Sequence, residues 1–327
     1  MKRSFITLFG ILSVLTACEK LDTHEPGALV PKTVDQDAHL PSIAVNHTQL
    51  HSEAFGNSTD PMVVVLHGGP GGDYRALMNC KELVNHGYYV IFYDQRGSGL
   101  SKREGKGTYS VQLILNDLSE VIRYYRSSPD QQVILLGHSW GAMLASAYIN
   151  AYPDAIDGAI LCEPGGLVWS DIKSYTKRVM NYSVTSETLN DATYLDQFIT
   201  GKATEHELLD YKFGLYAGSG TKDSPLGDED EIPFWRKGAI VNQVFMEIGE
   251  REKPDWTTNL DLFNEKILFI YSERNKAYGA DYAQHVSSAY LQAQLYEVKG
   301  AGHEMLSFRT GWDNFLPKAL EYLNEIK

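Results

Sequence analysis

The segment GHSWG at residues 137–141 sets a serine between two glycines, directly after the apolar run Val133–Leu136. This pattern, between a strand and a helix, is typical of a sharp turn that holds a serine hydroxyl up as a nucleophile. The positive end of the helix that follows would favour negative charge developing nearby. We therefore predict that Ser139 is the nucleophile of an acyl-transfer reaction.

A serine hydroxyl needs a general base before it can attack a carbonyl carbon. His303 ends the small-residue loop GAGH at 300–303, just past the strand-like segment Gln294–Val298. A loop at the end of a late strand can reach the nucleophile, so we expect His303 to be the base. His138 is adjacent to Ser139 in the chain, and its side chain is expected to point away from the hydroxyl.

A second glycine-rich segment, VVVLHGGPGG at residues 63–72, follows another apolar run. Acyl transfer passes through an oxyanion that backbone N–H groups must hold, and glycines allow a ligand to approach the backbone closely. We expect one donor to be the N–H of Trp140, directly after the nucleophile. The second is expected to be the N–H of Gly69, with Gly68 as the alternative.

The elements that must position these residues alternate along the chain. Continuous apolar runs are typical of strands buried on both faces, and helical spacing separates them. This alternation predicts a mostly parallel sheet with helices on both faces, preceded by a hairpin. The expected strands are 43–45, 49–55, 62–67, 88–94, 133–137, 156–162, 267–271 and 294–298, and the expected helices are 74–86, 111–125, 142–151, 282–292 and 315–326.

The alternation of strand-like and helix-like segments stops after residue 168 and resumes near residue 258. The intervening segment contains many aromatic and acidic residues and no clear strand. We therefore predict a core built from residues 41–165 and 258–327, with residues 166–257 inserted as a helical cap over one end of the sheet. Reactive groups are expected at the carboxyl ends of the strands, beneath this cap.

Four segments together resemble the α/β-hydrolase superfamily, and within it the proline iminopeptidase (prolyl aminopeptidase, peptidase family S33) branch. The resemblance covers the core and not the cap, and it implies an α/β-hydrolase fold. It also implies a serine hydrolase that forms an acyl-enzyme, an aminopeptidase acting on small peptides or amides with a free N-terminus. The four segments are HGGPGG at 67–72, YDQRGSGLS at 93–101, GHSWG at 137–141 and GAGH at 300–303.

Two other functions stay open at this stage. A carboxylesterase or lactonase of the same fold would use the same nucleophile and base. A catalytically silent envelope binding protein is the alternative from another class, and it is motivated by Asn275. This amide stands where the family usually places the triad aspartate, on the loop after the strand 267–271, and an amide cannot stabilise an imidazolium as a carboxylate does.

Three carboxylates could replace the missing aspartate. Glu163 ends the strand that follows the nucleophile helix, at the same sheet edge as Ser139, and we prefer it. This placement resembles a subset of haloalkane dehalogenases, in which the acid has moved to that strand end. Glu273 is the first alternative, and Asp281 is the second.

The cap supplies candidates for recognition of the substrate. In the family that the chain resembles, acidic cap residues bind the free amine of the substrate. We therefore consider Glu205 and Glu247 as amine-binding residues and Trp235 as part of an apolar wall. A solvated acidic surface with aromatic residues packed inside the cap is the alternative interpretation.

Composition narrows the partners. The 327 residues carry 42 acidic and 29 basic side chains, a formal net charge of −13, which disfavours a nucleic-acid partner. No segment has the spacing of a metal-ligand set or of a nucleotide-binding loop, so we expect neither a metal nor a cofactor. The expected partner is a small molecule or short peptide that serves as the substrate.

The N-terminal segment resembles a bacterial lipoprotein signal. A basic start and a short apolar run end in LTAC at residues 15–18, and such signals make the cysteine the lipidated first residue. We expect residues 1–17 to be the signal peptide, Cys18 the lipid attachment site and residues 18–40 a polar tether. An ordinary secretory signal is the alternative.

This signal implies a membrane-anchored protein of the bacterial cell envelope. Glu19 follows the cysteine, rather than the aspartate associated with retention in the inner membrane, so the outer membrane on its periplasmic side is preferred. Cys80 and Cys162 lie in apolar contexts and are expected to be buried thiols, with a disulfide as the alternative that this location would permit.

Overall fold

The computed structural model describes residues 29–179, 204–218 and 224–327. The predicted signal peptide, Cys18 and the first part of the predicted tether lie outside the described residues. Within the described ranges, no helix has both the length and the apolar character that crossing a bilayer requires.

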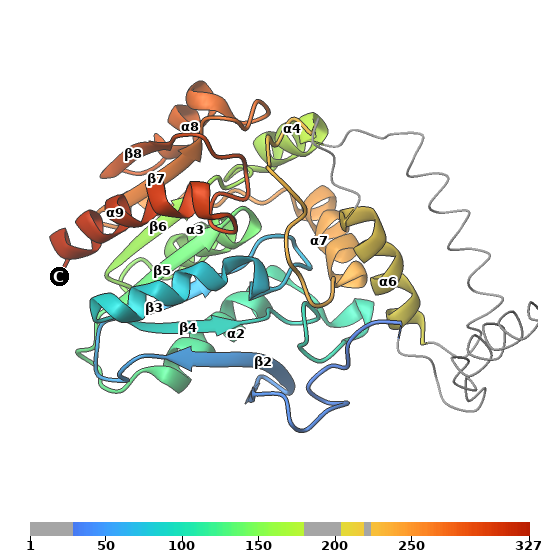
Figure 1. The fold of residues 1–327 in the computed structure, drawn as a ribbon. Coiled ribbons are helices and arrows are strands. Elements are labelled where there is room, and N and C mark those ends of the chain that lie inside the picture. The colour runs from blue at the N-terminus through green and yellow to red at the C-terminus, as the bar shows by residue number, and fades with distance from the viewer. Residues whose placement is uncertain (1–28, 180–203, 219–223) are drawn as a thin grey trace, which may run out of the picture.

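Eight strands form one sheet in the order β1-β2-β4-β3-β5-β6-β7-β8 (Figure 1). The first hairpin is antiparallel and joins β4, and the remaining strands are parallel. The predicted strands are confirmed, with ends shifted by one or two residues. Their bounds are β1 Ser42–Val45, β2 Thr48–Phe55, β3 Met62–Leu66, β4 Tyr89–Tyr93, β5 Val133–His138, β6 Gly158–Cys162, β7 Ile267–Ser272 and β8 Ala293–Val298.

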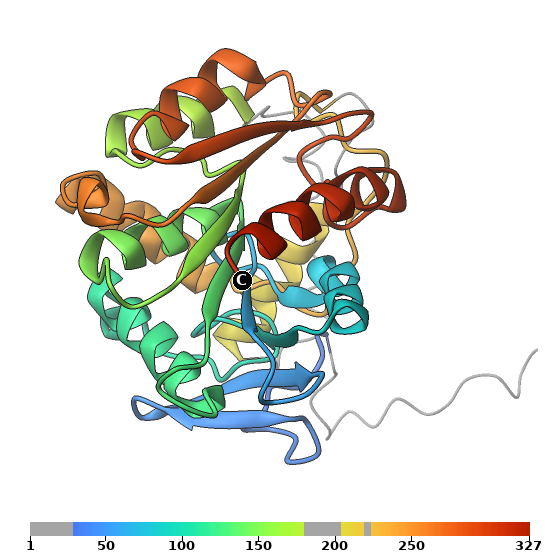
Figure 2. The same ribbon diagram turned by 90° about the vertical axis from the view of Figure 1, so that its left-hand side faces the viewer.

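Helices cover both faces of the sheet (Figure 2). The 3-10 helix η1 (Tyr74–His86) and α9 (Arg309–Glu325) pack on one face, and α2 (Val111–Tyr125), α3 (Trp140–Ala151) and α8 (Gly279–Ser287) pack on the other. The strands supply alternate residues to the two resulting cores, as in β3, where Val63 and Val65 face one side while Met62, Val64 and Leu66 face the other.

Two helices differ from the predicted ranges by more than two residues, and α3 begins two residues earlier than predicted. The last helix begins at Arg309 instead of residue 315, because Trp312 is fully buried and its ring nitrogen donates to Glu82 on η1. The preceding helix, α8, ends at Ser287 instead of residue 292. There the hydroxyls of Ser287 and Ser288 donate back to the carbonyls of the last turn, which competes with continuation of the helix.

The predicted cap contributes three described helices beyond the carboxyl ends of the strands (Figure 1): α4 (Trp169–Val179), α6 (Glu205–Gly218) and α7 (Ala239–Glu252). Short 3-10 turns complete the described helices, η2 at Lys106–Thr108 and η3 at Leu260–Leu262.

A buried charge cluster ties α6 to the core. The carboxylate of Asp210 accepts hydrogen bonds from Arg236 at 2.7 Å and from the core residue Arg103 at 2.8 Å. It also accepts one from the backbone N–H of Ala239, the first residue of α7, at 2.9 Å. Because burial of a charge is tolerated only when the charge is paired and hydrogen-bonded, this cluster holds two cap helices in one place.

The last part of the predicted tether packs against the folded domain instead of standing apart from it. Thr33 and Val34 are buried, and the N–H of Val34 donates to the carbonyl of Leu100 at 2.9 Å. The carbonyl of Pro31 accepts a hydrogen bond from Arg236. The ordered domain therefore includes residues before the predicted start at residue 41, because this segment buries side chains and pairs its backbone with the core.

Candidate active site

Ser139 occupies the sharp turn between β5 and α3. Its φ of 54° and ψ of −119° are unusual for a residue with a side chain, and such strain is typical of a nucleophile elbow. The flanking glycines are required by space: a Cβ on Gly137 would lie 2.5 Å from the carbonyl oxygen of Gly141, and a Cβ on Gly141 would lie 2.0 Å from that of Leu66. The turn therefore holds the Ser139 hydroxyl in a fixed position.

His303 follows β8 and is buried beside the turn. Its Nδ1 lies 2.6 Å from Oε2 of Glu163, and His303 and Ser139 line the same cavity. Because Glu163 engages Nδ1, Nε2 is the ring nitrogen that can take a proton from a serine hydroxyl. The predicted base and the preferred acid are thus brought together at the sheet edge that carries Ser139.

Glu163 lies at the end of β6, in a left-handed backbone conformation with φ of 45°, and is fully buried. Its Oε1 accepts hydrogen bonds from the N–H of Ser272 at 2.7 Å and from the hydroxyl of Ser272 at 2.6 Å. Its Oε2 accepts one from Nδ2 of Asn275 at 2.7 Å, in addition to the contact with His303. These donors satisfy a carboxylate that would otherwise be costly to bury.

The electrostatic consequence appears at His303. Burial alone would lower the pKa of this imidazole, but the hydrogen bond and the charge of Glu163 outweigh burial and raise the pKa to about 9. Glu304 and Asp228 act in the same direction. The site is therefore built to stabilise a positively charged His303, which is the state that forms when a base takes the serine proton.

The two alternative acids lie elsewhere. Glu273 is exposed, where it accepts hydrogen bonds from the N–H of Gly300 at 2.8 Å and from Lys299 at 3.3 Å. Asp281 is exposed on α8. Neither carboxylate has a hydrogen bond or an ion pair with His303 in the described part of the chain.

His138 supports the base from behind. Its ring is buried with its centroid 4.7 Å from that of His303, and its Nε2 donates to the backbone carbonyl of His303 at 2.8 Å. Burial lowers the pKa of His138. The residue therefore braces the loop that carries His303.

The glycine-rich loop passes directly against the nucleophile. A Cβ on Gly68 would lie 3.3 Å from Cβ of Ser139. Gly69 has φ of +135°, and a Cβ there would lie 2.5 Å from the backbone nitrogen of Gly71. Gly69 and Trp140 line the cavity together with Ser139. His67 braces the loop, since its Nδ1 donates to the carbonyl of Gly68 at 2.8 Å.

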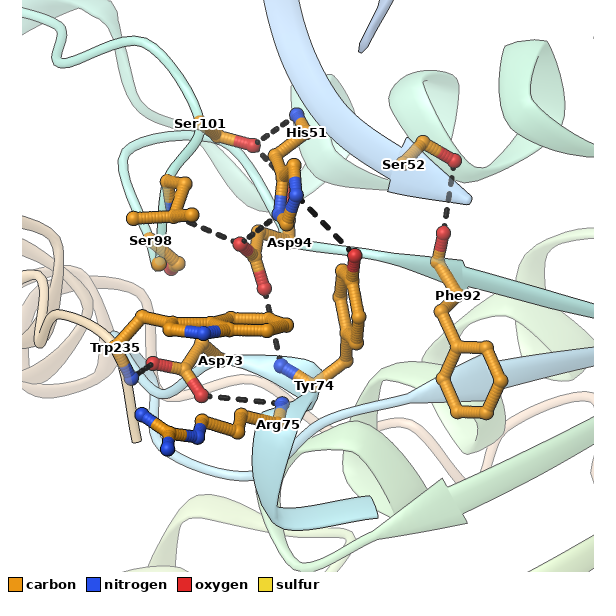
Figure 3. Close-up of polar contacts among 12 residues, drawn as sticks. His51, Ser52, Asp73, Tyr74, Arg75, Phe92, Asp94, Ser98, Ser101 and Trp235 are labelled. Atoms are coloured by element: carbon orange, nitrogen blue, oxygen red, sulfur yellow. Dashed lines mark hydrogen bonds and ion pairs between the residues drawn. The ribbon is translucent and has the colours of Figure 1, made fainter. Parts of the chain in front are cut away.

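A buried polar network fixes the start of η1, directly after this loop (Figure 3). Asp94 accepts hydrogen bonds from the N–H groups of Tyr74 at 3.0 Å and Leu100 at 2.8 Å, and it lies 2.8 Å from Nδ1 of His51. Asp73 accepts a hydrogen bond from the N–H of Trp235 at 2.7 Å. Asp94 of the motif DQRGSG thus has a structural role, and the neighbouring Asp73, which the sequence did not single out, joins core to cap.

Two cavities of about 230 Å³ each meet at Ser139, Gly69, Pro70 and Asn242. The first is apolar and is also bordered by His303. Aromatic and apolar side chains from α3, the cap and the segment after it form much of its wall, including Trp140, Met143, Trp169, Tyr175, Phe245 and Trp256.

The second cavity is polar. Glu304, Lys237, Asp73 and His138 contribute to its wall. Glu304, directly after His303 in the chain, has a side chain that is 15% exposed. Burial would raise the pKa of Glu304, but the nearby His138, His303 and Lys237 outweigh it and keep that pKa below its ordinary value. Adjacency to His303 is the one sequence signal that could have pointed to this residue.

The residues predicted for substrate binding do not reach either cavity. Glu205 and Glu247 are exposed, and Glu247 accepts a hydrogen bond from Gln243 on its own helix. Trp235 packs edge-on against Tyr74 with ring centroids 4.9 Å apart, so it belongs to the contact between cap and core. The structure therefore does not bring these three residues to the cavities that Ser139 lines: Glu205 and Glu247 lie on outward faces of α6 and α7, and Trp235 lies in the segment between those helices.

One group of side chains has the geometry to hold a cation. The potential ligand atoms of His138, His303 and Glu304 all lie within 4.8 Å of one another. Both histidines already have hydrogen-bond partners, Glu163 for His303 and a backbone carbonyl for His138. A metal here would compete with the role of His303 as a base.

The two cysteines of the described residues, Cys80 and Cys162, are buried thiols, as the sequence predicts.

Comparison with known proteins places this geometry in context. Residues 57–203 match the family model described as serine aminopeptidase, S33. The chain is 31% identical over 279 residues to the proline iminopeptidase PfmaB of Pestalotiopsis fici. The aligned region covers 80% of this chain and 92% of that protein. It spans less than half of the first curated relatives that it matches, 41% and 32% of their lengths.

Solved structures share the fold. A proline iminopeptidase from Mycobacterium smegmatis superposes with a TM-score of 0.58 at 16% identity, covering 88% of this chain and 98% of that one. An enol-lactonase from Burkholderia xenovorans LB400 gives a TM-score of 0.58 at 16% identity, covering 87% and 100%. At this level of identity the likeness concerns the fold alone.

Proposed function

The chain belongs to the α/β-hydrolase family related to proline iminopeptidase, and is therefore a hydrolase; from this premise we propose that it is a serine aminopeptidase. Its proposed substrates are short peptides or amides with a free N-terminus. The observation that carries the proposal is the contact of 2.6 Å between His303 and Glu163 beside the strained Ser139.

In the proposed reaction, the Ser139 hydroxyl attacks the scissile carbonyl carbon while Nε2 of His303 takes its proton. Glu163 holds the ring and stabilises the imidazolium. The N–H groups of Gly69 and Trp140 hold the oxyanion of the tetrahedral intermediate. His303 then donates its proton to the leaving amine as the C–N bond breaks, which leaves an ester between the acyl group and Ser139.

The second half of the reaction repeats these roles with water. His303 removes a proton from a water molecule, which attacks the ester carbonyl, and the same two N–H groups hold the new oxyanion. Collapse of this intermediate returns the proton from His303 to Ser139 and releases the carboxylic acid. One water molecule is consumed, and Ser139 and His303 return to their starting protonation states.

The polar cavity supports a substrate with a free amine. Glu304 borders the same cavity as Ser139, and its carboxylate is kept anionic by the positive surroundings described above. An ammonium group is the natural partner of such a carboxylate. We therefore propose Glu304 as the amine-binding residue, in place of the exposed cap acids Glu205 and Glu247.

A carboxylesterase or lactonase is the second candidate. Among the described residues that line the apolar cavity, none is acidic, and such a cavity suits an uncharged acyl group. One of the structural neighbours is an enol-lactonase. The alternative of a catalytically silent binding protein is motivated by the missing triad carboxylate at Asn275. Because Glu163 supplies a carboxylate to His303, that motivation no longer applies.

Blocking the amine of the substrate tests the proposal. The full chain should hydrolyse prolyl 4-nitroanilide at least about tenfold faster than N-acetylprolyl 4-nitroanilide, because a charge-assisted hydrogen bond contributes roughly 1.5–3 kcal/mol. Glu304→Gln should remove most of this preference, while Glu247→Gln should keep it. Equal turnover of the two anilides, or turnover of 4-nitrophenyl butyrate alone, would favour the esterase.

The lipid anchor remains a proposal based on the N-terminal sequence. We propose that Cys18 is acylated in the bacterial envelope. Metabolic labelling with radioactive palmitate should mark the full chain and not its Cys18→Ser variant. Equal labelling of both chains, or of neither, would contradict this proposal.

A further inference from the structure

Lys237 is a nearly buried cation at the polar cavity. The residue is 8% exposed and borders the cavity together with Ser139 and Gly69. Among the described residues, its ammonium group has neither an ion pair nor a hydrogen bond, and it lies 4.7 Å from the centre of the Phe234 ring. A cation removed from water without an anionic partner is costly, and a polar cavity beside a nucleophile is where a ligand can supply that partner.

The backbone around Lys237 is held in place before any ligand binds. The N–H of Arg236, on one side, donates to Asp73 at 3.0 Å, and the N–H of Gly238, on the other, donates to the carbonyl of Gly71 in the glycine-rich loop at 2.7 Å. A Cβ on Gly238 would lie 2.3 Å from the carbonyl oxygen of Gly97, so the chain is also packed closely on its far side. The backbone of Lys237 is therefore held in a fixed position next to the proposed oxyanion site, before a ligand binds.

The two acidic residues that border the polar cavity with Lys237, Asp73 and Glu304, differ in the number of hydrogen bonds that they accept. Asp73 accepts three backbone hydrogen bonds, from Arg75, Trp235 and Arg236. Within the described ranges, the Glu304 side chain accepts one long hydrogen bond, 3.3 Å from the hydroxyl of Ser307, and lies 3.8 Å from His138. Among the described residues, Lys237 and Glu304 are therefore the two opposite charges of this cavity that lack a strong hydrogen bond, and a zwitterion can supply one to each.

We propose that Lys237 binds the C-terminal carboxylate of the substrate, so that the enzyme acts preferentially on dipeptides. This inference rests on the proposed aminopeptidase function. In a dipeptide, the free amine and the free carboxylate lie on either side of the single peptide bond. The amine then contacts Glu304, the carboxylate contacts Lys237, and the scissile carbonyl lies against Ser139.

The length of the substrate follows from the reach of the chain. Each residue spans at most about 3.6 Å, so the carboxylate of the residue directly after the scissile bond lies near enough to the reacting carbonyl to occupy the cavity that Lys237 and Ser139 both border. A tripeptide places an uncharged peptide group at the same position, and a C-terminal amide places a neutral group there. Both substrates would leave the Lys237 charge unmatched.

The test compares L-prolyl-L-leucine with L-prolyl-L-leucinamide, using the full chain. Wild-type kcat/KM should favour the free acid by about tenfold or more, the effect of one charge-assisted hydrogen bond. Lys237→Met should bring the ratio close to one, and Lys237→Arg should retain the preference. Lys173→Met, which removes an exposed lysine on α4 paired with Glu250, should keep the wild-type ratio. An unchanged ratio in a folded Lys237→Met protein would overturn the inference.

A second readout separates this inference from the proposed function. Prolyl 4-nitroanilide has no carboxylate, so its hydrolysis measures aminopeptidase activity that does not depend on carboxylate binding by Lys237. If no peptide or anilide is cleaved, the proposed function fails, and binding decides the inference instead. The dipeptide should then slow the labelling of Ser139 by a fluorophosphonate more strongly than the amide does, and Lys237→Met should abolish this difference. Equal protection in the wild type would overturn the inference.

Discussion

Asn275 donates a hydrogen bond of 2.7 Å from Nδ2 to Oε2 of Glu163, the same oxygen that lies 2.6 Å from Nδ1 of His303. The position at which the sequence resemblance predicts the acid thus holds an amide that supports an acid on the neighbouring strand. Compared with the arrangement that the sequence resemblance predicts, the carboxylate has moved from the loop after β7 to the end of β6, an exchange in which the histidine still receives a carboxylate.

This exchange predicts the effect of removing the carboxylate. Glu163→Gln should lower kcat by up to about 10,000-fold, because an amide neither fixes the ring nor stabilises the imidazolium, as in other triads that lose their carboxylate. The matched variant Glu273→Gln removes an exposed carboxylate from the neighbouring loop and should stay within about twofold of wild type. Steady-state kinetics on prolyl 4-nitroanilide separates the two, and the reverse ranking would assign the acid to Glu273.

The exchange also predicts the effect of restoring the usual residue. Asn275→Asp should lower kcat by roughly 10- to 1,000-fold, since two carboxylates this close cannot both ionise and Glu163 loses a donor. KM should change little, because neither side chain is assigned to substrate binding. The measurement is the pair of kinetic constants, and a variant as active as wild type would show that the Asn275 hydrogen bond has no positioning role.

A double variant adds a sharper test. In Glu163→Gln/Asn275→Asp, a carboxylate returns to the side chain whose Nδ2 now lies 3.5 Å from Nδ1 of His303. This protein should recover part of the activity that Glu163→Gln alone loses. A double variant less active than both single variants would contradict the reciprocal arrangement.

The raised pKa of His303 predicts how activity depends on pH. The base must be neutral to act, and its pKa is raised from 6.5 to about 9, so kcat/KM should rise with pH through the alkaline range towards about 9. Glu163→Gln removes the main cause of the raised pKa, so this limb should move to lower pH while the maximum rate falls. A limb that stays in place in the variant would assign it to another group.

The same shift predicts a pH dependence of stability. The pKa of His303 is higher in the folded state, so its ion pair with Glu163 stabilises the fold fully below pH 6.5 and loses this effect as pH rises through about 9. Urea unfolding of wild type and His303→Gln should therefore differ in pH dependence across this window. Parallel stability curves for the two proteins would contradict the pairing.

The cap anchor predicts a loss of stability away from the reacting atoms. Asp210→Ala should destabilise the protein by about 3–5 kcal/mol, because it leaves Arg236 buried without its anion. The control is Glu250→Ala, which breaks an exposed pair with Lys173 and should cost about 1 kcal/mol or less. Denaturant unfolding measures both, and equal losses would show that the anchor contributes no more than a surface pair.

The parts of the site that the sequence predicts are those with local causes. The nucleophile turn needs its two glycines and the serine within five residues, and the loop of His303 is equally short. Glu163 could be predicted because parallel strands end at one edge of a sheet, so a charged residue at the end of an apolar strand must lie near Ser139.

The residues that line the cavities could not be predicted in this way. Glu205 and Glu247 are acidic residues of the cap, as expected of amine-binding groups, but their helices turn those positions to solvent. Lys237 and Glu304 come from segments far apart in the chain, and only the packing of the cap on the core brings them to one cavity. Such pairs depend on tertiary contacts that no local pattern encodes.

The measurement that tests the account most directly is the release of nitroaniline from prolyl 4-nitroanilide by the full chain and by its Ser139→Ala variant. The account predicts saturable release by the wild type and a loss of at least about a thousandfold in the variant. Release that survives in Ser139→Ala, or a wild type that hydrolyses esters while leaving the anilide intact, would contradict it.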